Sequence, residues 1–174
     1  MQSVYRPVCP IPSELVQRLD PALDHWAQEY DQLDSFSKDL GDFSRPGQYC
    51  PGSLGLEIHA VGAAIQALHP RPIGGWCYRI EKGLGGRGPW HRDDTRISIC
   101  SIGPATTDVF VGRTSSNPFF EPREAQVRHA DEAWLIDVLP SDHHCRGAAH
   151  DLTAIRQVFI FFHAPKVSAK MRTL

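Results

Sequence analysis

The residues whose types and spacing point to chemistry are His91 and Asp93, within the sequence GPWHRDDTR at residues 88–96. In an extended segment, side chains alternate between two sides, so residues two positions apart point the same way. His91 and Asp93 would therefore present an imidazole and a carboxylate to one point in space. These are two of the three protein ligands of the 2-His-1-carboxylate site, which holds Fe(II) and leaves coordination positions open.

The third ligand of such a site would be a second histidine from a distant part of the chain. Candidates lie well beyond the first pair, in the cluster Asp142-His143-His144-Cys145 and at His150. Neighbouring residues face opposite ways in an extended segment, so His143 and His144 would not both point at the metal. His150 could reach it only if its loop folds back.

An arginine follows this cluster, because Arg156 opens the apolar segment QVFIFF at residues 157–162. His-x-Asp, then a distant His, then an Arg is the order typical of the Fe(II)/2-oxoglutarate-dependent oxygenases. The sequence resembles that family over residues 73–163. The resemblance implies a double-stranded β-helix (jelly roll, cupin-like), with Fe(II) and 2-oxoglutarate as cofactors. It also implies a dioxygenase that uses O2 to hydroxylate, desaturate or cyclise its substrate.

The resemblance assigns the metal ligands residue by residue. His91 and Asp93 match the His-x-Asp motif of the family. His144 is our choice for the third ligand, because it lies four residues past Pro140, close to the spacing that the family uses. Cys145 stands at the distance from the later arginine that many members use for their histidine, which is a departure from the pattern. The third ligand therefore stays open among His144 and its alternatives His143, Cys145 and His150.

The resemblance also assigns the cosubstrate site. Arg156 matches the basic residue that grips the far carboxylate of 2-oxoglutarate, a task that suits a planar guanidinium with paired donors. Arg96, three residues past Asp93, is a second candidate for binding this anion. The carboxylate of Asp93 argues against halogenation, because halogenases of the family lack it to make room for chloride.

Two alternatives remain open. The first is a metal-dependent dioxygenase of the same fold that does not use 2-oxoglutarate, which an Arg156 side chain pointing away from the metal would favour. The second is a jelly-roll binding protein without catalysis, which Cys145 at the distal ligand spacing would favour.

The elements that must position these residues begin with two helices. Asp20-Pro21 is a helix start, with Leu23, Trp26, Ala27, Tyr30 and Leu33 following at helical spacing. A second helix is expected over residues 53–68, where apolar residues form one stripe and His69-Pro70 ends it. Residues 1–12 are expected to form an extended arm and residues 35–52 a loop. Residues 1–70 would then be a helical support for the core.

Short strands separated by turn signals are expected over the rest of the chain. They fall near residues 76–80, 95–102, 108–111, 126–128, 133–139 and 157–162, with a histidine-rich loop before the last. Such spacing favours an antiparallel barrel or sandwich. The whole chain is expected to be one mainly β domain, with helices near its N-terminus and the jelly-roll core at residues 73–163.

Composition narrows the classes of partner. The 174 residues carry a net charge of −2, which gives no sign of nucleic-acid binding. No apolar run approaches a membrane span, and no signal peptide is apparent, so a cytoplasmic location is expected. Five widely spaced cysteines argue against a disulfide framework. A chain of this length leaves little room for a domain that recognises a macromolecule, and we therefore expect a small-molecule substrate. The oligomeric state stays open.

Overall fold

The computed structural model describes residues 6–42, 52–86, 88–102, 109–113, 126–127, 133–147 and 151–163. Its helices within these ranges are α1 (Ser13–Gln17), α2 (Asp20–Glu29) and α3 (Ser53–Leu68). Its strands within them are β1 (Arg6–Pro10), β2 (Phe36–Asp42), β3 (Gly75–Lys82), β4 (Ile97–Ile102), β5 (Val109–Arg113), β6 (Gln126–Val127), β7 (Trp134–Val138), β8 (Asp142–Arg146) and β9 (Ile155–Phe162).

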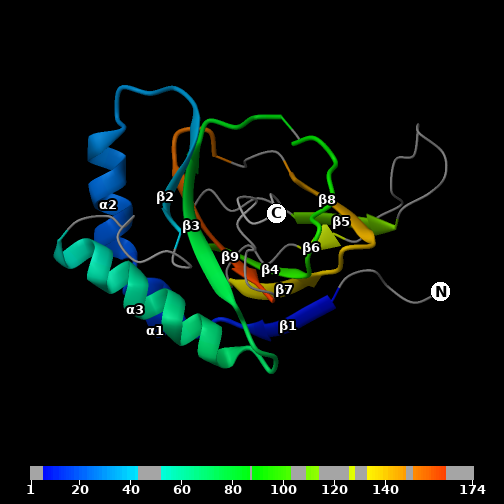
Figure 1. The fold of residues 1–174 in the computed structure, drawn as a ribbon. Helices are drawn as coiled ribbons and strands as arrows, with labels where there is room; N and C mark the ends of the chain where they lie inside the picture. Colours follow the sequence, from blue (N-terminus) through cyan, green and yellow to red (C-terminus); the bar gives the residue numbers. More distant parts are fainter. Residues whose placement is uncertain are drawn as a thin grey trace, which may run out of the picture.

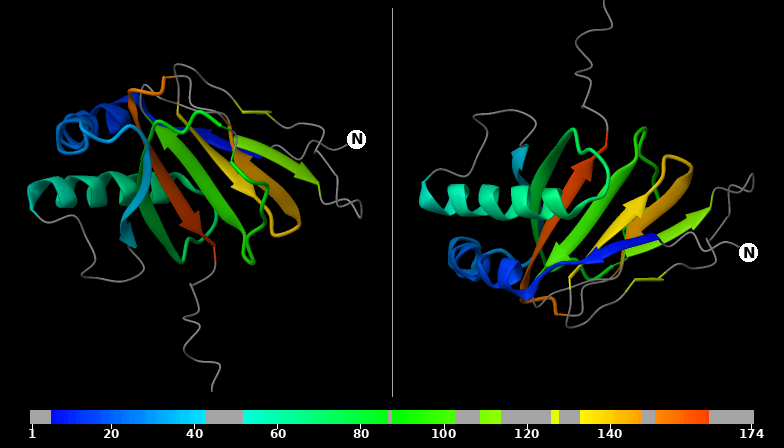
Figure 2. Two further views of the ribbon diagram at one scale, coloured as in Figure 1. Left: turned by 90° about the horizontal axis from the view of Figure 1, so that it is seen from above. Right: turned by 90° about the horizontal axis from the view of Figure 1, so that it is seen from below.

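The strands form two antiparallel sheets. The larger sheet has the order β1-β7-β4-β9-β3-β2 and the smaller has the order β6-β5-β8. The helices gather on one side of the larger sheet, and the smaller sheet lies on its other side (Figures 1 and 2). This confirms the prediction of a mainly β fold with helices near the N-terminus.

The two faces of the larger sheet carry different side chains, because successive side chains along each strand point to opposite faces. On the helical face, Tyr78, Phe159 and Phe161 are almost fully buried in the core. The Trp26 indole donates to the Tyr78 hydroxyl at 3.1 Å, and that hydroxyl donates to Gln157 Oε1 at 2.5 Å. The chain of hydrogen bonds satisfies three polar groups inside the helical layer.

Helix α3 packs closely on the sheet through its apolar stripe. Ile58, Val61 and Ile65 are buried, as the helical spacing predicts. Gly62 lies on the same side, and a Cβ built there would meet the Trp76 ring at 2.2 Å. Glycine at this position therefore lets the helix approach the indole of β3.

The N-terminal region contributes more than helices, so its prediction as a helical support was incomplete. Residues 36–42 form β2, which pairs with β3, whereas a loop was predicted there. Residues 6–10 form β1, which pairs with β7. β1 and β2 are the two edge strands of the larger sheet. Edge strands tolerate Pro, Gly and charged residues. The segment 6–10 contains two prolines and the segment 36–42 contains a glycine and charged residues, which is why neither carries a strong strand signal.

The histidine-rich segment is also a strand. Residues 142–146 form β8 and pair with β5, with His144 opposite Val111, whereas the sequence predicted a loop.

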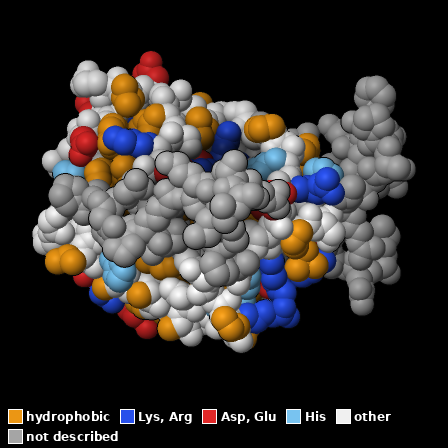
Figure 3. Space-filling model, viewed as in Figure 1, with side chains coloured by type: hydrophobic (Ala, Val, Ile, Leu, Met, Phe, Trp, Pro, Cys, Tyr) orange, Lys and Arg blue, Asp and Glu red, His pale blue; other side chains and the backbone are white. Residues whose placement is uncertain are grey.

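None of the helices in the described ranges is long and apolar enough to cross a membrane. Acidic, basic and hydrophobic side chains are interspersed on the coloured part of the face in Figure 3.

Candidate metal centre

The His-x-Asp segment lies along β8, on the smaller sheet. The Gly88 amide donates to the Arg146 carbonyl at 2.8 Å. His91 and His144 then form an isolated antiparallel bridge, in which each backbone amide donates to the other's carbonyl, at 3.0 and 2.9 Å. The sequence predicted an extended segment at His91 and Asp93 that leads into a strand over residues 95–102. The structure begins this strand, β4, at Ile97 and holds His91 by the isolated bridge. The bridge brings the two halves of the candidate site together.

His91, Asp93 and His144 form one group of metal-ligating side chains. One ligand atom from each residue lies within 4.8 Å of the others. His144 Nε2 is 3.3 Å from Asp93 Oδ2, and the two imidazole rings have centroids 4.1 Å apart. His144 is buried, Asp93 is partly buried and His91 is exposed. The group therefore sits where one side faces protein and the other faces solvent.

The surroundings of the two imidazoles leave them able to bind a cation. His91 Nδ1 lies 3.1 Å from the Pro89 carbonyl, which accepts a hydrogen bond from a protonated Nδ1 and leaves Nε2 free for a metal. Burial, with further contributions from His91 and His143, lowers the pKa of His144 to about 4. His144 is thus neutral near pH 7, as a ligand must be.

The charged form of the Asp93 carboxylate is disfavoured by burial. Burial raises the pKa of Asp93, and the nearby His91 partly offsets this increase. A bound cation would favour the charged carboxylate. Two neutral imidazoles and one carboxylate are a donor set that suits Fe(II).

A cavity of about 720 Å³ extends from this group between the two sheets. Its lining comes from β2, β3, β4, β8 and β9 as well as from the His-x-Asp segment. The floor on β4 and β9 is apolar, formed by Ile97, Ile99, Val158, Ile160 and Phe162. The three candidate ligands contribute polar groups to the lining. A charged cluster on β3, β8 and β9 contributes others, from Arg79, Glu81, Arg146 and Arg156.

Arg156 belongs to that charged cluster and lines the cavity. Its side chain is 7% exposed and forms an ion pair with Glu81, which lies directly opposite on β3. Nε and Nη1 of Arg156 have no hydrogen-bond partner among the described residues. Burial lowers the pKa of Arg156, and Glu81 partly opposes this change. The guanidinium is therefore only partly satisfied within the described protein, which favours an additional anionic partner.

Two further residues surround Glu81. Ser37 Oγ donates to Glu81 Oε1 at 3.3 Å, and Arg146 Nε lies 3.9 Å from Glu81 Oε2. Arg146 also donates to the backbone carbonyls of Leu84 and Gly147. One buried carboxylate thus faces two guanidinium groups at this part of the cavity.

The other sequence candidates lie elsewhere or play different parts. Cys145 is buried and lines the cavity but is not one of the three grouped ligands. His143, on the same strand, is half-buried and also outside the group. Arg96 forms an ion pair with Asp137 and is not among the residues that line the cavity, because it precedes β4 near a second polar cluster. His150 lies outside the described residues.

That second cluster consists of His69, Asp137 and His163 and was missed by sequence reasoning. No short motif connects these three residues. A usable signal was Asp137, a charged residue within the otherwise apolar strand WLIDV. A buried carboxylate of this kind needs partners, which could have prompted a search for histidines at nearby chain positions.

Comparisons with known proteins identify no family. No protein-family model matches the chain, and no curated protein sequence matches it. Among solved structures, it is similar to AviO1 from Streptomyces viridochromogenes Tue57. The TM-score is 0.47 and the identity 15%, over 92% of this chain and 88% of that one. A likeness of this degree carries no conclusion about function.

Proposed function

We propose that this protein is an Fe(II)/2-oxoglutarate-dependent oxygenase with a jelly-roll core. The observation that carries the proposal is that His91, Asp93 and His144 converge on one cavity that Arg156 also lines. These residues come from separate parts of the chain. Two antiparallel sheets on either side of the cavity support the jelly-roll assignment.

His91, Asp93 and His144 would hold the iron. The donor set suits Fe(II), and the hydrogen bond of His91 Nδ1 to the Pro89 carbonyl orients that imidazole for coordination through Nε2. The exposure of His91 leaves one side of the group open to small ligands. When bound, iron supplies the redox chemistry that activates O2.

Arg156 would bind the far carboxylate of 2-oxoglutarate. Nε and Nη1, which lack a hydrogen-bond partner within the described part of the chain, are donors that a carboxylate can accept from. The burial of Arg156 keeps such a contact away from competing water. Glu81 would hold the guanidinium in place through its Nη2. The nearby Arg146 adds positive charge that compensates for Glu81.

The apolar floor of the cavity would exclude water and contact the hydrocarbon parts of the ligands. Ile99 and Val158 belong to this floor. A cavity of about 720 Å³ is in the range that accommodates small molecules. We therefore propose a small-molecule substrate that is hydroxylated, desaturated or cyclised. The five cysteines are widely spaced and form no Cys-x-x-Cys motif, which fits a reducing compartment, so we propose a cytoplasmic location.

A second candidate function is a metal-dependent dioxygenase that does not use 2-oxoglutarate. The ion pair between Arg156 and Glu81 favours it, because an internal carboxylate already contacts the guanidinium. In the first function, 2-oxoglutarate binds Arg156 beside Glu81. In the second, Glu81 is the carboxylate that pairs with Arg156, and no 2-oxoglutarate binds.

The experiment is to incubate iron-loaded protein with O2 and ascorbate, with and without 2-oxoglutarate, and to measure succinate and residual O2. The Asp93→Ala variant is the control for free iron. Succinate that forms with the parent protein and not with Asp93→Ala would support the proposal. O2 consumption without a requirement for 2-oxoglutarate would favour the second candidate, and the absence of iron binding would favour a non-catalytic binding protein.

A further inference from the structure

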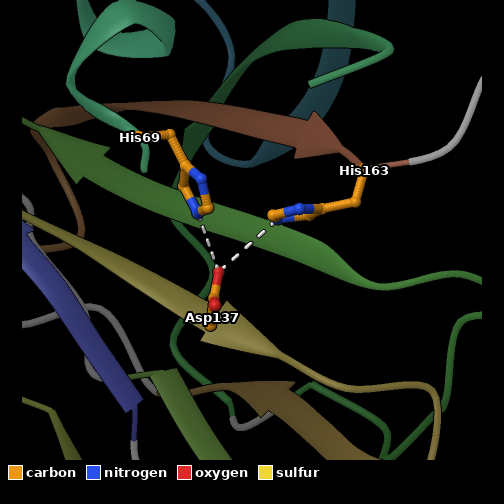
Figure 4. A group of neighbouring side chains, drawn as sticks. All are labelled: His69, Asp137 and His163. Carbon is orange, nitrogen blue, oxygen red and sulfur yellow. Dashed lines mark hydrogen bonds and ion pairs between the residues drawn. The ribbon is translucent and has the colours of Figure 1, made fainter. Parts of the chain in front are cut away.

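A second group of metal-ligating side chains lies apart from the cavity, at the other face of the larger sheet. His69 directly follows α3, Asp137 belongs to β7, and His163 directly follows β9 (Figure 4). Both imidazoles point toward the carboxylate, with Nε2 of His69 and of His163 at 3.1 and 3.5 Å from Asp137 Oδ1. All three side chains are at least nine-tenths buried.

A fourth polar atom completes this arrangement. Ser98, which pairs with Asp137 in the register of β4 and β7, is fully buried. Its Oγ lies 3.2 Å from His69 Nε2, 2.7 Å from His163 Nε2 and 2.5 Å from Asp137 Oδ1. Ligands of tetrahedral zinc at about 2.0–2.2 Å from the ion lie about 3.3 Å from one another. The separations of 3.1, 3.5 and 3.2 Å are close to those of a zinc coordination shell, whereas Ser98 Oγ lies at hydrogen-bond distance from His163 Nε2 and Asp137 Oδ1.

We propose that His69, Asp137 and His163 bind a zinc ion, with Ser98 Oγ at the fourth side. Imidazole nitrogen and carboxylate oxygen are ligands that suit zinc. The surroundings also fix the ligands: Arg96 contacts Asp137 Oδ2, which leaves Oδ1 for the ion. His69 Nδ1 lies 3.2 Å from the Arg71 carbonyl, the usual outer partner of a metal-bound imidazole.

The charge of the site selects among cations. Arg96 already neutralises Asp137, so the group offers little net negative charge to attract a hard cation. Ca²⁺ and Mg²⁺ depend on several oxygen ligands, whereas zinc binds neutral imidazole well. The two histidines would therefore provide most of the affinity, which favours zinc over calcium or magnesium.

The ion would join the two layers of the protein. His69 lies at the end of α3, and His163 and Asp137 belong to strands of the larger sheet or their ends. Binding all three would fix the end of the helix to the sheet, and the free energy of binding would add to the free energy of unfolding. This role is independent of the proposed oxygenase activity.

The same atoms can also form a hydrogen-bonded network without an ion, and the two arrangements need opposite tautomers of His69. Without zinc, the Arg71 amide donates to His69 Nδ1 at 3.0 Å, and a protonated Nε2 donates to Asp137. With zinc on Nε2, the proton must be on Nδ1 and is donated to the Arg71 carbonyl. The protonated nitrogen of His69 therefore reports which arrangement exists.

The first test counts zinc in protein dialysed after zinc loading, using His91→Ala to disable the other metal group. We expect His91→Ala to retain one equivalent and the double variant His91→Ala/His163→Ala to retain none. His91→Ala/His59→Ala is the matched control, because His59 is an exposed histidine of α3 outside the cluster. The control should keep the zinc. No retained zinc in His91→Ala, or equal retention in the His163→Ala double variant, would overturn the proposal.

The second test needs no substitution in the cluster, so it holds even if the His163 variant does not fold. Nitrogen-15 NMR of labelled histidine in the His91→Ala protein gives the tautomer of His69 with and without zinc. We expect the proton on Nδ1 when zinc is present and on Nε2 after chelation. A proton that stays on Nε2 at saturating zinc would overturn the proposal.

Discussion

His91 and His144 exchange a pair of backbone hydrogen bonds beside β8, the end strand of the smaller sheet, the amide of each donating to the carbonyl of the other. The bridge sets the imidazole ring centroids 4.1 Å apart without relying on a metal. The register of β8 therefore decides which residue of the segment DHHC meets His91 and Asp93. A shift by one residue would place a neighbour there and turn His144 away.

This register gives the first prediction. His144→Ala should lose the iron, because it removes a ligand from a group of three, whereas His143→Ala should keep it. Iron content after desalting is the measurement, and His143→Ala is the matched control on the same strand. A Cys145→Ser protein that loses iron while His144→Ala retains it would show that Cys145 is the third ligand.

Arg156 gives the second prediction. A charge-assisted bidentate contact to 2-oxoglutarate in a buried site contributes roughly 2–4 kcal/mol, or about 30- to 1000-fold in affinity. Arg156→Ala should weaken cosubstrate binding by that factor and leave iron binding nearly unchanged, since Arg156 is not a ligand. Arg156→Lys should recover part of the loss, because the ammonium keeps the charge without the planar fork.

The measurement is the Kd for 2-oxoglutarate in iron-loaded protein. Arg96→Ala is the informative comparison, because Arg96 contacts Asp137 and does not line the cavity. It should bind 2-oxoglutarate like the parent. Unchanged affinity in Arg156→Ala would remove Arg156 from the cosubstrate site.

Glu81 gives the third prediction. Glu81→Gln removes the charge that faces the buried Arg156, and loss of one partner of a buried pair costs about 3–5 kcal/mol. The variant should therefore unfold at a lower temperature than the parent. A 2-oxoglutarate carboxylate would supply the missing charge, so the cosubstrate should raise the Tm of Glu81→Gln more than that of the parent.

Asp39→Asn is the control for this comparison. Asp39 pairs with Arg79 in the same cavity lining, but its side chain is 60% exposed. An exposed pair contributes about 0–1 kcal/mol, so the control should have nearly the parent's Tm. Equal Tm increases with 2-oxoglutarate in Glu81→Gln and the parent would show that the anion does not interact with this pair.

Gly62 gives the fourth prediction, which tests the packing of α3. Gly62→Ala places a methyl group where the Trp76 ring now lies, and overpacking of this kind costs roughly 1–3 kcal/mol. Gly86→Ala is the control, since a Cβ there meets nothing within 4 Å. Denaturant unfolding should show a lower midpoint for Gly62→Ala and little change for Gly86→Ala. Equal midpoints would contradict the close approach of helix and indole.

The sequence predicted the elements whose signals are local and strong. Helix α3 was predicted over residues 53–68 because its apolar residues recur at helical spacing, and the structure has these bounds. It also predicted most strands of the core, because apolar residues dominate them. Strands β1 and β2 were missed, because residues at a sheet edge pair on one side only, so prolines in β1 and charged residues in β2 are tolerated there.

The candidate site was predictable only where residues are close in sequence. His91 and Asp93 form a motif, whereas the assignment of His144 relied on spacing and remained one of several. The pairing of Arg156 with Glu81 depends on the register of β3 and β9, which sequence spacing does not give. The cluster around Asp137 depends in the same way on contacts between distant segments.

We propose that Fe(II) and 2-oxoglutarate bind together in the cavity between the sheets. The most direct test is an anaerobic titration of the protein with Fe(II) and then 2-oxoglutarate, followed by visible absorption. We expect a charge-transfer band that saturates at one iron per chain and is absent in Asp93→Ala. An iron-loaded parent protein that develops no such band at saturating 2-oxoglutarate would contradict it.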